Sequence, residues 1–311
     1  MFGDDCAGRP DDLFEALTDV ALETDIMSND PSTNPFASWT KVYLPYCNQD
    51  VFIGGGETSV FDSITVHRFG AINVRAAVRY TRDVLWTLLD EEGGDGYRPD
   101  QIVAMFGGFS AGAFGTLYNY HWMVDDLQWP RTTAFPDAGL ALDNGEPLFS
   151  IRGLGNLLIA GTPPLGWGST DYFPPYCFLG DCAVGPELLE ATAPRLKAVP
   201  EQQFLILSNQ NDSTQVGTTF FKDTPTWINA MRQSYCDTRD LKGVNYYLTT
   251  VSESVHVISV RDELYSGSVD GTVMSDWLAG AISDPDEVQS KVEEGTLVDD
   301  IERVDAFPCE L

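Results

Sequence analysis

Short apolar runs alternate along the chain with longer segments whose apolar residues recur at helical spacing. The apolar runs predict β-strands at 41–46, 101–106, 132–135, 203–208 and 245–251. The helical spacing predicts α-helices at 67–92, 113–123, 227–235 and 270–282. Strands that alternate with helices are typical of an α/β fold, in which helices cover both faces of a mostly parallel sheet. We expect one such domain over residues 1–311.

Two segments depart from this alternation. Residues 150–200 are rich in Gly and Pro and predict an irregular, cap-like insertion, while residues 283–311 form an acidic tail that we expect to pack loosely. The insertion carries four aromatic residues that either crowd the site as a lid or pack among themselves: Trp167, Tyr172, Phe173 and Tyr176.

The chain is strongly acidic, because its 311 residues include 47 Asp and Glu against 18 Lys and Arg, a formal net charge of −29. Such a chain repels phosphate backbones and anionic membranes, which argues against nucleic-acid binding. No run of about 18 apolar residues predicts a membrane span. The acidity is typical of a solvated surface. Since no D-x-[DN]-x-[DN]-G loop occurs, we expect no metal and no cofactor.

The even number of cysteines indicates disulfides. The expected pairs are Cys177–Cys182, Cys6–Cys47 and Cys236–Cys309. The first pair follows from the tight stretch "FLGD" between its members, whereas spacing does not fix the other two. Disulfides would place the protein outside the cytoplasm, and the alternative is six buried thiols in a cytosolic protein.

The first residues, "MFGDDCAGRP", have neither the basic nor the apolar region of a signal peptide. Either the protein is cytosolic, or the chain begins downstream of its true start. The expected disulfides favour the second interpretation, an extracytoplasmic protein whose signal peptide is not part of this chain.

The stretch "GGFSAGAFG" at 107–115 raises the question of nucleophilic catalysis. It contains Gly108-x-Ser110-x-Gly112, leaves an apolar strand and enters a predicted helix. This is the context of a nucleophile elbow, where small residues flank the serine because the turn is tight. We interpret Ser110 as a nucleophile. The alternative is a serine in a glycine-rich turn.

A serine hydroxyl needs a base, and the chain offers three histidines. His121 lies about 16 Å from Ser110 along the axis of the same predicted helix, too far to reach it. His67 precedes the serine and breaks the Ser…Asp…His order of α/β hydrolases. His256 follows the strand at 245–251, from where a loop can return to the elbow. We therefore assign His256 as the base.

The acid that orients the histidine should follow a strand between Ser110 and His256. Asp212 does so, because "QFLILS" runs into "NQND". Asp137 in "PDAGLALDN" is the rival. If Asp212 is the acid, we expect Asp137 to be a structural carboxylate that accepts backbone N–H bonds behind the elbow.

An oxyanion hole needs at least two aimed N–H groups. Ala111, directly after the nucleophile, can supply one. Gly54-Gly55-Gly56 is a second source by composition, but it lies several residues beyond its strand, so we expect it only to shape the rim. The remaining donors would then lie upstream of Met1.

Taken in order, these segments resemble the pectinacetylesterase family of Notum-like serine carboxylesterases. The resemblance is carried by "VYLPYCNQDVFIGG", "GGFSAGAFG", "PDAGLALDN", "LILSNQNDSTQ", "VHVI" and "DGTVMSDWLAG". It implies an α/β-hydrolase-like fold and a secreted, disulfide-bonded, metal-independent esterase, with Ser110 as nucleophile, His256 as base and Asp212 as its partner. The chain departs from the family at "SESVHVIS", which lacks the usual polar or cysteine residues near the histidine. It also departs at "MFGDDCAG", which begins just after the expected glycine-rich oxyanion segment.

These observations predict a monomeric serine carboxylesterase that removes O-acyl groups, most simply O-acetyl groups from a polysaccharide. If the first strand is missing, the chain as given should be a poor esterase with an unpaired sheet edge. The alternatives are a catalytically silent binding or surface protein on the same scaffold, or a lipid or polyester deacylase with a deep apolar pocket beside Ser110.

Overall fold

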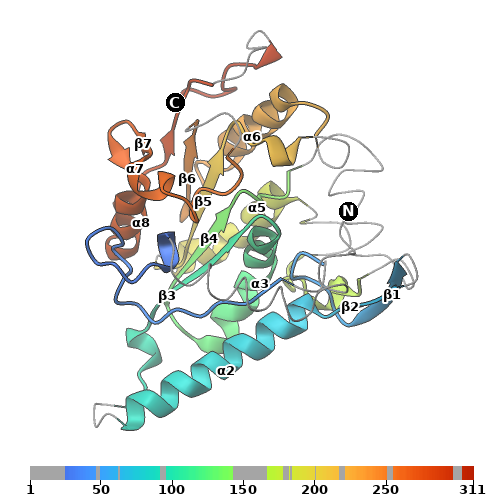
Figure 1. Cartoon of the computed structure of the whole chain (residues 1–311), viewed down its shortest axis with the longest axis vertical. Coiled ribbons are helices and arrows are strands. Elements are labelled where there is room, and N and C mark those ends of the chain that lie inside the picture. Colours follow the sequence, from blue (N-terminus) through green and yellow to red (C-terminus); the bar gives the residue numbers. More distant parts are fainter. Residues whose placement is uncertain are drawn as a thin grey trace.

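A computed structural model describes residues 25–46, 50–61, 64–91, 96–142, 167–177, 182, 184–199, 201–216, 221–250, 255–296 and 303–311. Its centre is a five-stranded parallel sheet in the order β3-β4-β5-β6-β9 (Figure 1). The strands are β3 (Val103–Phe109), β4 (Arg131–Asp137), β5 (Gln203–Asn209), β6 (Val244–Thr249) and β9 (Lys291–Val292). The expected α/β fold with a parallel sheet is thereby confirmed.

Helices cover both faces of this sheet, as Figure 1 shows. One face carries α3 (Ala111–Leu127), α5 (Gly185–Ala198) and α6 (Thr224–Thr238), and the other carries α7 (Glu263–Ser266) and α8 (Met274–Ser283). The long helix α2 (Gly70–Glu91) packs on the outside of α3. Every residue of β5 is buried, because Phe204 and Ile206 face one layer while Leu205 and Leu207 face the other.

Smaller elements complete the described chain. The antiparallel pairs are β1 (Glu57–Phe61) with β2 (Ile64–Arg68) and β7 (Ser268–Val269) with β8 (Thr272–Val273). Single turns of 3₁₀ helix are η1 (Asp25–Met27), η2 (Pro99–Gln101), η4 (Ser169–Tyr172) and η5 (Ser213–Gln215). None of the described helices has the length and apolar character that a membrane span requires.

The strand expected at 41–46 is absent, because these residues have no regular secondary structure. Alternating polarity specifies which side chains turn inward, but a strand also needs a paired neighbour. Here Lys41 instead donates from Nζ to the carbonyl oxygens of Ser28 and Ala37, which fastens the segment to the preceding loop.

The cap expected at 150–200 is not irregular throughout, because its last part forms α5. Pro186 occupies the first turn, where the missing N–H costs nothing, and a buried face of Leu188, Leu189 and Leu196 holds the helix despite Pro194. The high Gly and Pro content of this segment therefore led to an irregular prediction where the structure has a helix.

The acidic tail is not loosely packed in its described parts. Its strand β9 pairs with β6, and the buried Arg232 donates to the carbonyl oxygens of Glu294 and Asp305. Cys309 is bonded to Cys236 in α6. The tail is thus held in place by contacts with residues distant in sequence, which its acidic composition does not predict.

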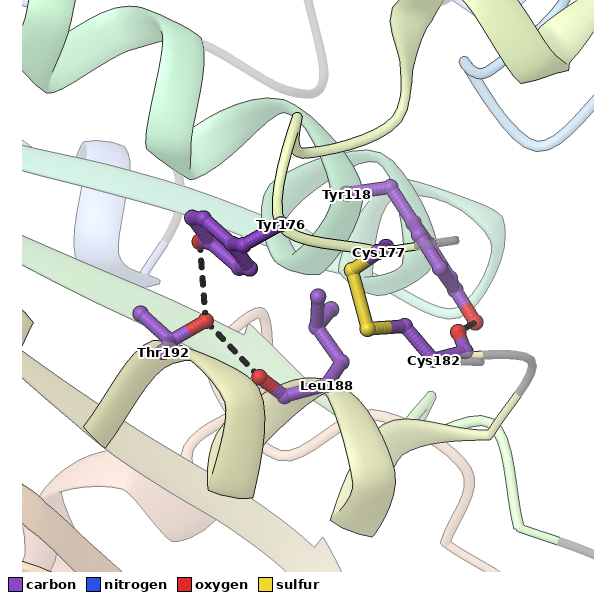
Figure 2. Close-up of a disulfide and its surroundings, with 6 residues drawn as sticks. All are labelled: Tyr118, Tyr176, Cys177, Cys182, Leu188 and Thr192. Atoms are coloured by element: carbon purple, nitrogen blue, oxygen red, sulfur yellow. Dashed lines mark hydrogen bonds between the residues drawn. A yellow bond between two sulfur atoms is a disulfide. The ribbon is translucent and has the colours of Figure 1, made fainter. Parts of the chain in front are cut away.

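The Cys177–Cys182 disulfide is present as the spacing predicts, and it links two residues of the segment that precedes α5. Figure 2 shows Tyr118 of α3 donating its hydroxyl to the Cys182 carbonyl oxygen, 3.1 Å away. Beside it, the hydroxyls of Tyr176 and Thr192 are hydrogen-bonded at 3.0 Å. The Cys236–Cys309 pair is also bonded as expected, whereas Cys6 and Cys47 lie outside the described residues.

Candidate active site

The residues singled out by sequence follow consecutive strands at the carboxyl edge of the parallel sheet. Ser110 follows β3, Asp137 ends β4, Asp212 follows β5 and His256 follows β6. Because parallel strands all end at one edge, residues far apart in sequence converge there, which is where α/β sheets bind their ligands.

Ser110 has the backbone of a strained turn. Its φ of 54° and ψ of −118° are unusual for any residue other than glycine, and it links the end of β3 directly to α3. A Cβ on Gly108 would lie 2.2 Å from the Gly112 carbonyl oxygen, so the residue two positions before the serine must be glycine for the turn to close. The Ser110 N–H donates to the Asp137 carbonyl oxygen at 2.9 Å, which fixes the turn to β4. We call residues 108–112 the elbow.

Ala111 begins α3 immediately after the serine. Within the described residues its N–H has no hydrogen-bond partner, whereas the next turn is closed by Ala113 N–H donating to the Ser110 carbonyl oxygen. An open N–H at the positive end of a helix dipole can stabilise negative charge beside the serine.

The triple glycine at 54–56 does not offer a full set of free donors. Gly55 N–H donates to the Trp167 carbonyl oxygen and Gly56 N–H to that of Arg68, both at 2.7 Å. These bonds join the glycines to β2 and to the segment before η4, and they occupy two of the three N–H groups.

The loop before these glycines supports the elbow helix. A Cβ on Gly115 of α3 would lie 2.6 Å from the Phe52 Cβ, and Asn119 of α3 donates from Nδ2 to the Phe52 carbonyl oxygen at 2.9 Å. The fully buried Asp50 accepts from Phe52 N–H and Gly70 N–H, and burial raises its pKa to about 6.

His256 and Asp212 form a close pair. The distance between His256 Nδ1 and Asp212 Oδ2 is 2.7 Å. The other carboxylate oxygen of Asp212 accepts from the Thr214 N–H at 2.9 Å, and the Asp212 side chain is fully buried. A carboxylate so placed sets the imidazole tautomer, with the proton on Nδ1 and the lone pair on Nε2.

Asp137 does not contact the imidazole nitrogens by a hydrogen bond in the described residues. Its Oδ2 instead accepts from the N–H groups of Ile258 and Ser259 at 2.9 and 2.7 Å. Burial raises the pKa of this fully buried carboxyl group to about 6. The rival acid thus has the contacts expected of a structural carboxylate behind the elbow.

The other two histidines lie elsewhere. His67 is exposed in β2, where Nδ1 lies 3.2 Å from the Thr58 hydroxyl, rather than at the start of a helix as its position had suggested. His121 is buried in α3 with its ring 6.4 Å from that of Tyr176, and burial lowers its pKa to about 4. Neither is joined to a carboxylate by a hydrogen bond in the described residues.

The aromatic residues of the cap region pack against the body of the fold. Phe173 stacks on Tyr118 of α3 at 5.0 Å, and the Arg75 guanidinium lies over Tyr172 at 4.6 Å. Arg68 lies over Trp167 at 5.5 Å. These contacts hold the segment around η4 against the body of the fold.

The structure also shows two contributors that sequence reasoning missed. Asn209, the last residue of β5, donates from Nδ2 to the Val255 carbonyl oxygen and accepts the Asn211 N–H. Val257, next to His256, has a φ of +70°, which is rare for a β-branched residue. An asparagine at the end of a buried strand was a readable signal for the first, but no local pattern marks the second.

Within the described residues, no hydrogen bond joins Ser110 to His256, whose Nε2 is buried and without a partner. The described residues also contain no group of three side chains suited to bind a metal. Among family models and curated protein sequences, none matches this chain. The site is therefore defined by its geometry: a serine on a strained turn, an oriented imidazole and a buried carboxylate.

Proposed function

We propose that the protein is a serine carboxylesterase in which Ser110 is the nucleophile, His256 the general base and Asp212 the residue that orients it. The observation that carries this proposal is the backbone of Ser110, whose φ and ψ place a non-glycine residue in a sparsely populated conformation between a strand and a helix. The Asp212–His256 pair supports it, because the imidazole presents an Nε2 that has no hydrogen-bond partner among the described residues.

The reaction follows from these groups. The Ser110 oxygen attacks the ester carbonyl carbon while His256 Nε2 takes the hydroxyl proton. The oxyanion that forms accepts the Ala111 N–H. The bond from carbon to the alcohol oxygen then breaks, and the imidazolium returns its proton to that oxygen. Water repeats the sequence on the acyl-enzyme, which releases the carboxylic acid and restores the serine.

The substrate and the compartment belong to the same proposal. An acetylated carbohydrate fits the motif resemblance, and a chain with a net charge of −29 favours a neutral over an anionic substrate. The two disulfides support a location outside the cytoplasm. The parallel sheet, with site residues after consecutive strands, supports an α/β-hydrolase-like arrangement.

The decisive test combines kinetics with active-site labelling. We expect Ser110→Ala, His256→Ala and Asp212→Asn each to lower kcat on a chromogenic acetate ester by at least about 10³-fold. Their losses should be strongly non-additive, because the three groups act as a unit. A fluorophosphonate should modify Ser110, as located by peptide mass spectrometry. His67→Ala is the matched control and should retain activity within about twofold, because that histidine is exposed in β2.

Three outcomes would contradict parts of the proposal. A folded protein that is inert to both the ester and the fluorophosphonate would favour a binding protein. Faster turnover of an octanoate than of an acetate ester would favour a lipid or polyester deacylase. Full activity in Asp212→Asn together with loss in Asp137→Asn would move the acid to Asp137.

A further inference from the structure

One buried residue contacts both the elbow and the loop that carries the base. The Asp137 carbonyl oxygen accepts the Ser110 N–H at 2.9 Å. Its carboxylate oxygen Oδ2 accepts the N–H groups of Ile258 and Ser259. The main chain of Asp137 therefore holds the nucleophile turn, and its side chain holds the residues that follow His256.

The chain between His256 and these two anchors is strained. Val257 has a φ of +70°, where its Cβ is crowded, and its side chain is buried. A backbone conformation of this kind persists only where the surrounding structure holds it in place. The two bonds to Asp137 Oδ2 begin one residue after Val257, which makes them the nearest restraint on the strained residue from its C-terminal side.

On the N-terminal side the restraint comes from another strand. Asn209 donates from Nδ2 to the Val255 carbonyl oxygen at 3.0 Å. The backbone on each side of His256 is therefore held by a hydrogen bond to another strand, to Asn209 before it and to Asp137 after it. Its imidazole is held by a third contact, the hydrogen bond to Asp212.

We propose that Asp137 is a positioning residue: its carboxylate keeps residues 257–259 on the strained path that directs His256 Nε2 toward Ser110. This inference rests on the proposed esterase function. It assigns the two carboxylates different tasks, since Asp212 bonds the imidazole itself while Asp137 bonds Ile258 and Ser259, the residues that follow it.

Two substitutions separate this role from a catalytic one. In Asp137→Asn the amide oxygen can take the place of Oδ2 and accept both N–H groups, while the amide nitrogen takes the place of Oδ1, which has no hydrogen-bond partner among the described residues. Asp137→Ala removes the acceptor altogether and leaves two buried N–H groups unpaired.

The experiment measures kcat and KM for both variants on an acetate ester, and amide hydrogen exchange at Ile258 and Ser259. We expect Asp137→Asn to retain kcat within about fivefold, with both amides still protected. We expect Asp137→Ala to lose about 10²–10³-fold in kcat with KM within about threefold, because a general base that is out of place loses most of its contribution. The two amides should exchange faster in this variant alone.

Wild-type kcat in a folded Asp137→Ala variant would overturn the proposal. So would an Asp137→Asn variant that is as inactive as Asp212→Asn, and this comparison decides the matter even if the alanine variant does not fold. A wild type that is inert to ester and to fluorophosphonate would instead overturn the esterase function itself. In that case the exchange data would still report the hydrogen bonds, so the two failures are distinguishable.

Discussion

The elbow and the base loop, residues 255–259, lie at the same edge of the sheet but are built in different ways. The elbow is shaped by its own neighbours, since a Cβ on Gly108 would meet the Gly112 carbonyl oxygen, four residues on. The base loop is held by residues 121 and 46 positions away, Asp137 and Asn209. The position of the nucleophile therefore depends mainly on the five residues of the elbow, with one hydrogen bond to β4, whereas that of the base depends on three strands being correctly paired.

The largest expected effect is a difference in kcat/KM between alanine substitutions at the two glycines of the elbow. A Cβ at position 108 would lie 2.2 Å from a carbonyl oxygen, whereas at position 112 its nearest contact is the Phe52 ring at 3.8 Å. We expect Gly108→Ala to lower kcat/KM on an acetate ester by about 10²–10³-fold, because the serine must shift by a substantial fraction of an ångström or more.

Gly112→Ala is the matched control for this substitution. It should stay within about threefold of wild type in kcat/KM and gain up to about 1 kcal/mol in helix stability. Equal losses in the two variants would show that the serine is not held by the close approach at Gly108, and the local character of the elbow would have to be abandoned.

The next effect concerns two buried carboxyl groups, one beside each region. Burial raises the pKa of Asp50, whose loop packs on α3, and of Asp137, which bonds the base loop, from 3.8 to about 6. A carboxyl group whose folded pKa exceeds its unfolded value contributes most stability below about pH 4 and loses it as the pH rises through 6. For a rise of about two pKa units, each loss approaches about 3 kcal/mol.

We therefore expect the free energy of unfolding in urea to be larger at pH 5 than at pH 7.5. Asp50→Asn should remove part of this dependence. The control is Asp223→Asn, because the pKa of Asp223 is lowered to about 2 by its hydrogen bonds to Thr226. Its contribution is already complete above pH 4, so this variant should keep the wild-type slope between pH 5 and 7.5. An Asp50→Asn variant with an unchanged slope would contradict the assigned pKa.

The sequence was informative where structure is local. The glycine pattern around Ser110 predicted a strand-to-helix turn, and the apolar run at 203–208 predicted β5 almost to its ends. The order of strands also predicted that Asp212 and His256 would meet, because both follow strands that end at the same edge. In a parallel sheet, residues that follow successive strands lie close together at one edge, so the strand order alone is enough to predict this contact.

Other features were beyond local patterns. Residues 41–46 alternate like a strand, yet the missing partner is a property of the tertiary fold. The tail is ordered by its pairing with β6 and by Cys309, neither of which its acidic composition suggests. The same holds for Val257, whose strained backbone exists only because distant residues hold its neighbours.

The smallest effect tests the comparison most directly, because it uses one residue type in both regions. Asn209 donates to the Val255 carbonyl oxygen beside the base, and Asn119 donates to the Phe52 and Gly115 carbonyl oxygens beside the elbow. Both side chains are buried, so each alanine substitution should cost about 1–3 kcal/mol of stability through lost and unpaired hydrogen bonds.

The two substitutions should differ in their effect on catalytic activity. We expect Asn209→Ala to lower kcat on an acetate ester about tenfold, because the chain before His256 loses its anchor, and Asn119→Ala to remain within about threefold, because the elbow closes on itself. Measurements at a temperature where both variants are fully folded remove the shared loss of stability from the result. If Asn119→Ala lowers kcat as much as Asn209→Ala does, the position of the nucleophile depends on distant contacts as heavily as that of the base. The distinction between an elbow held by its own residues and a base loop held by distant residues is then wrong.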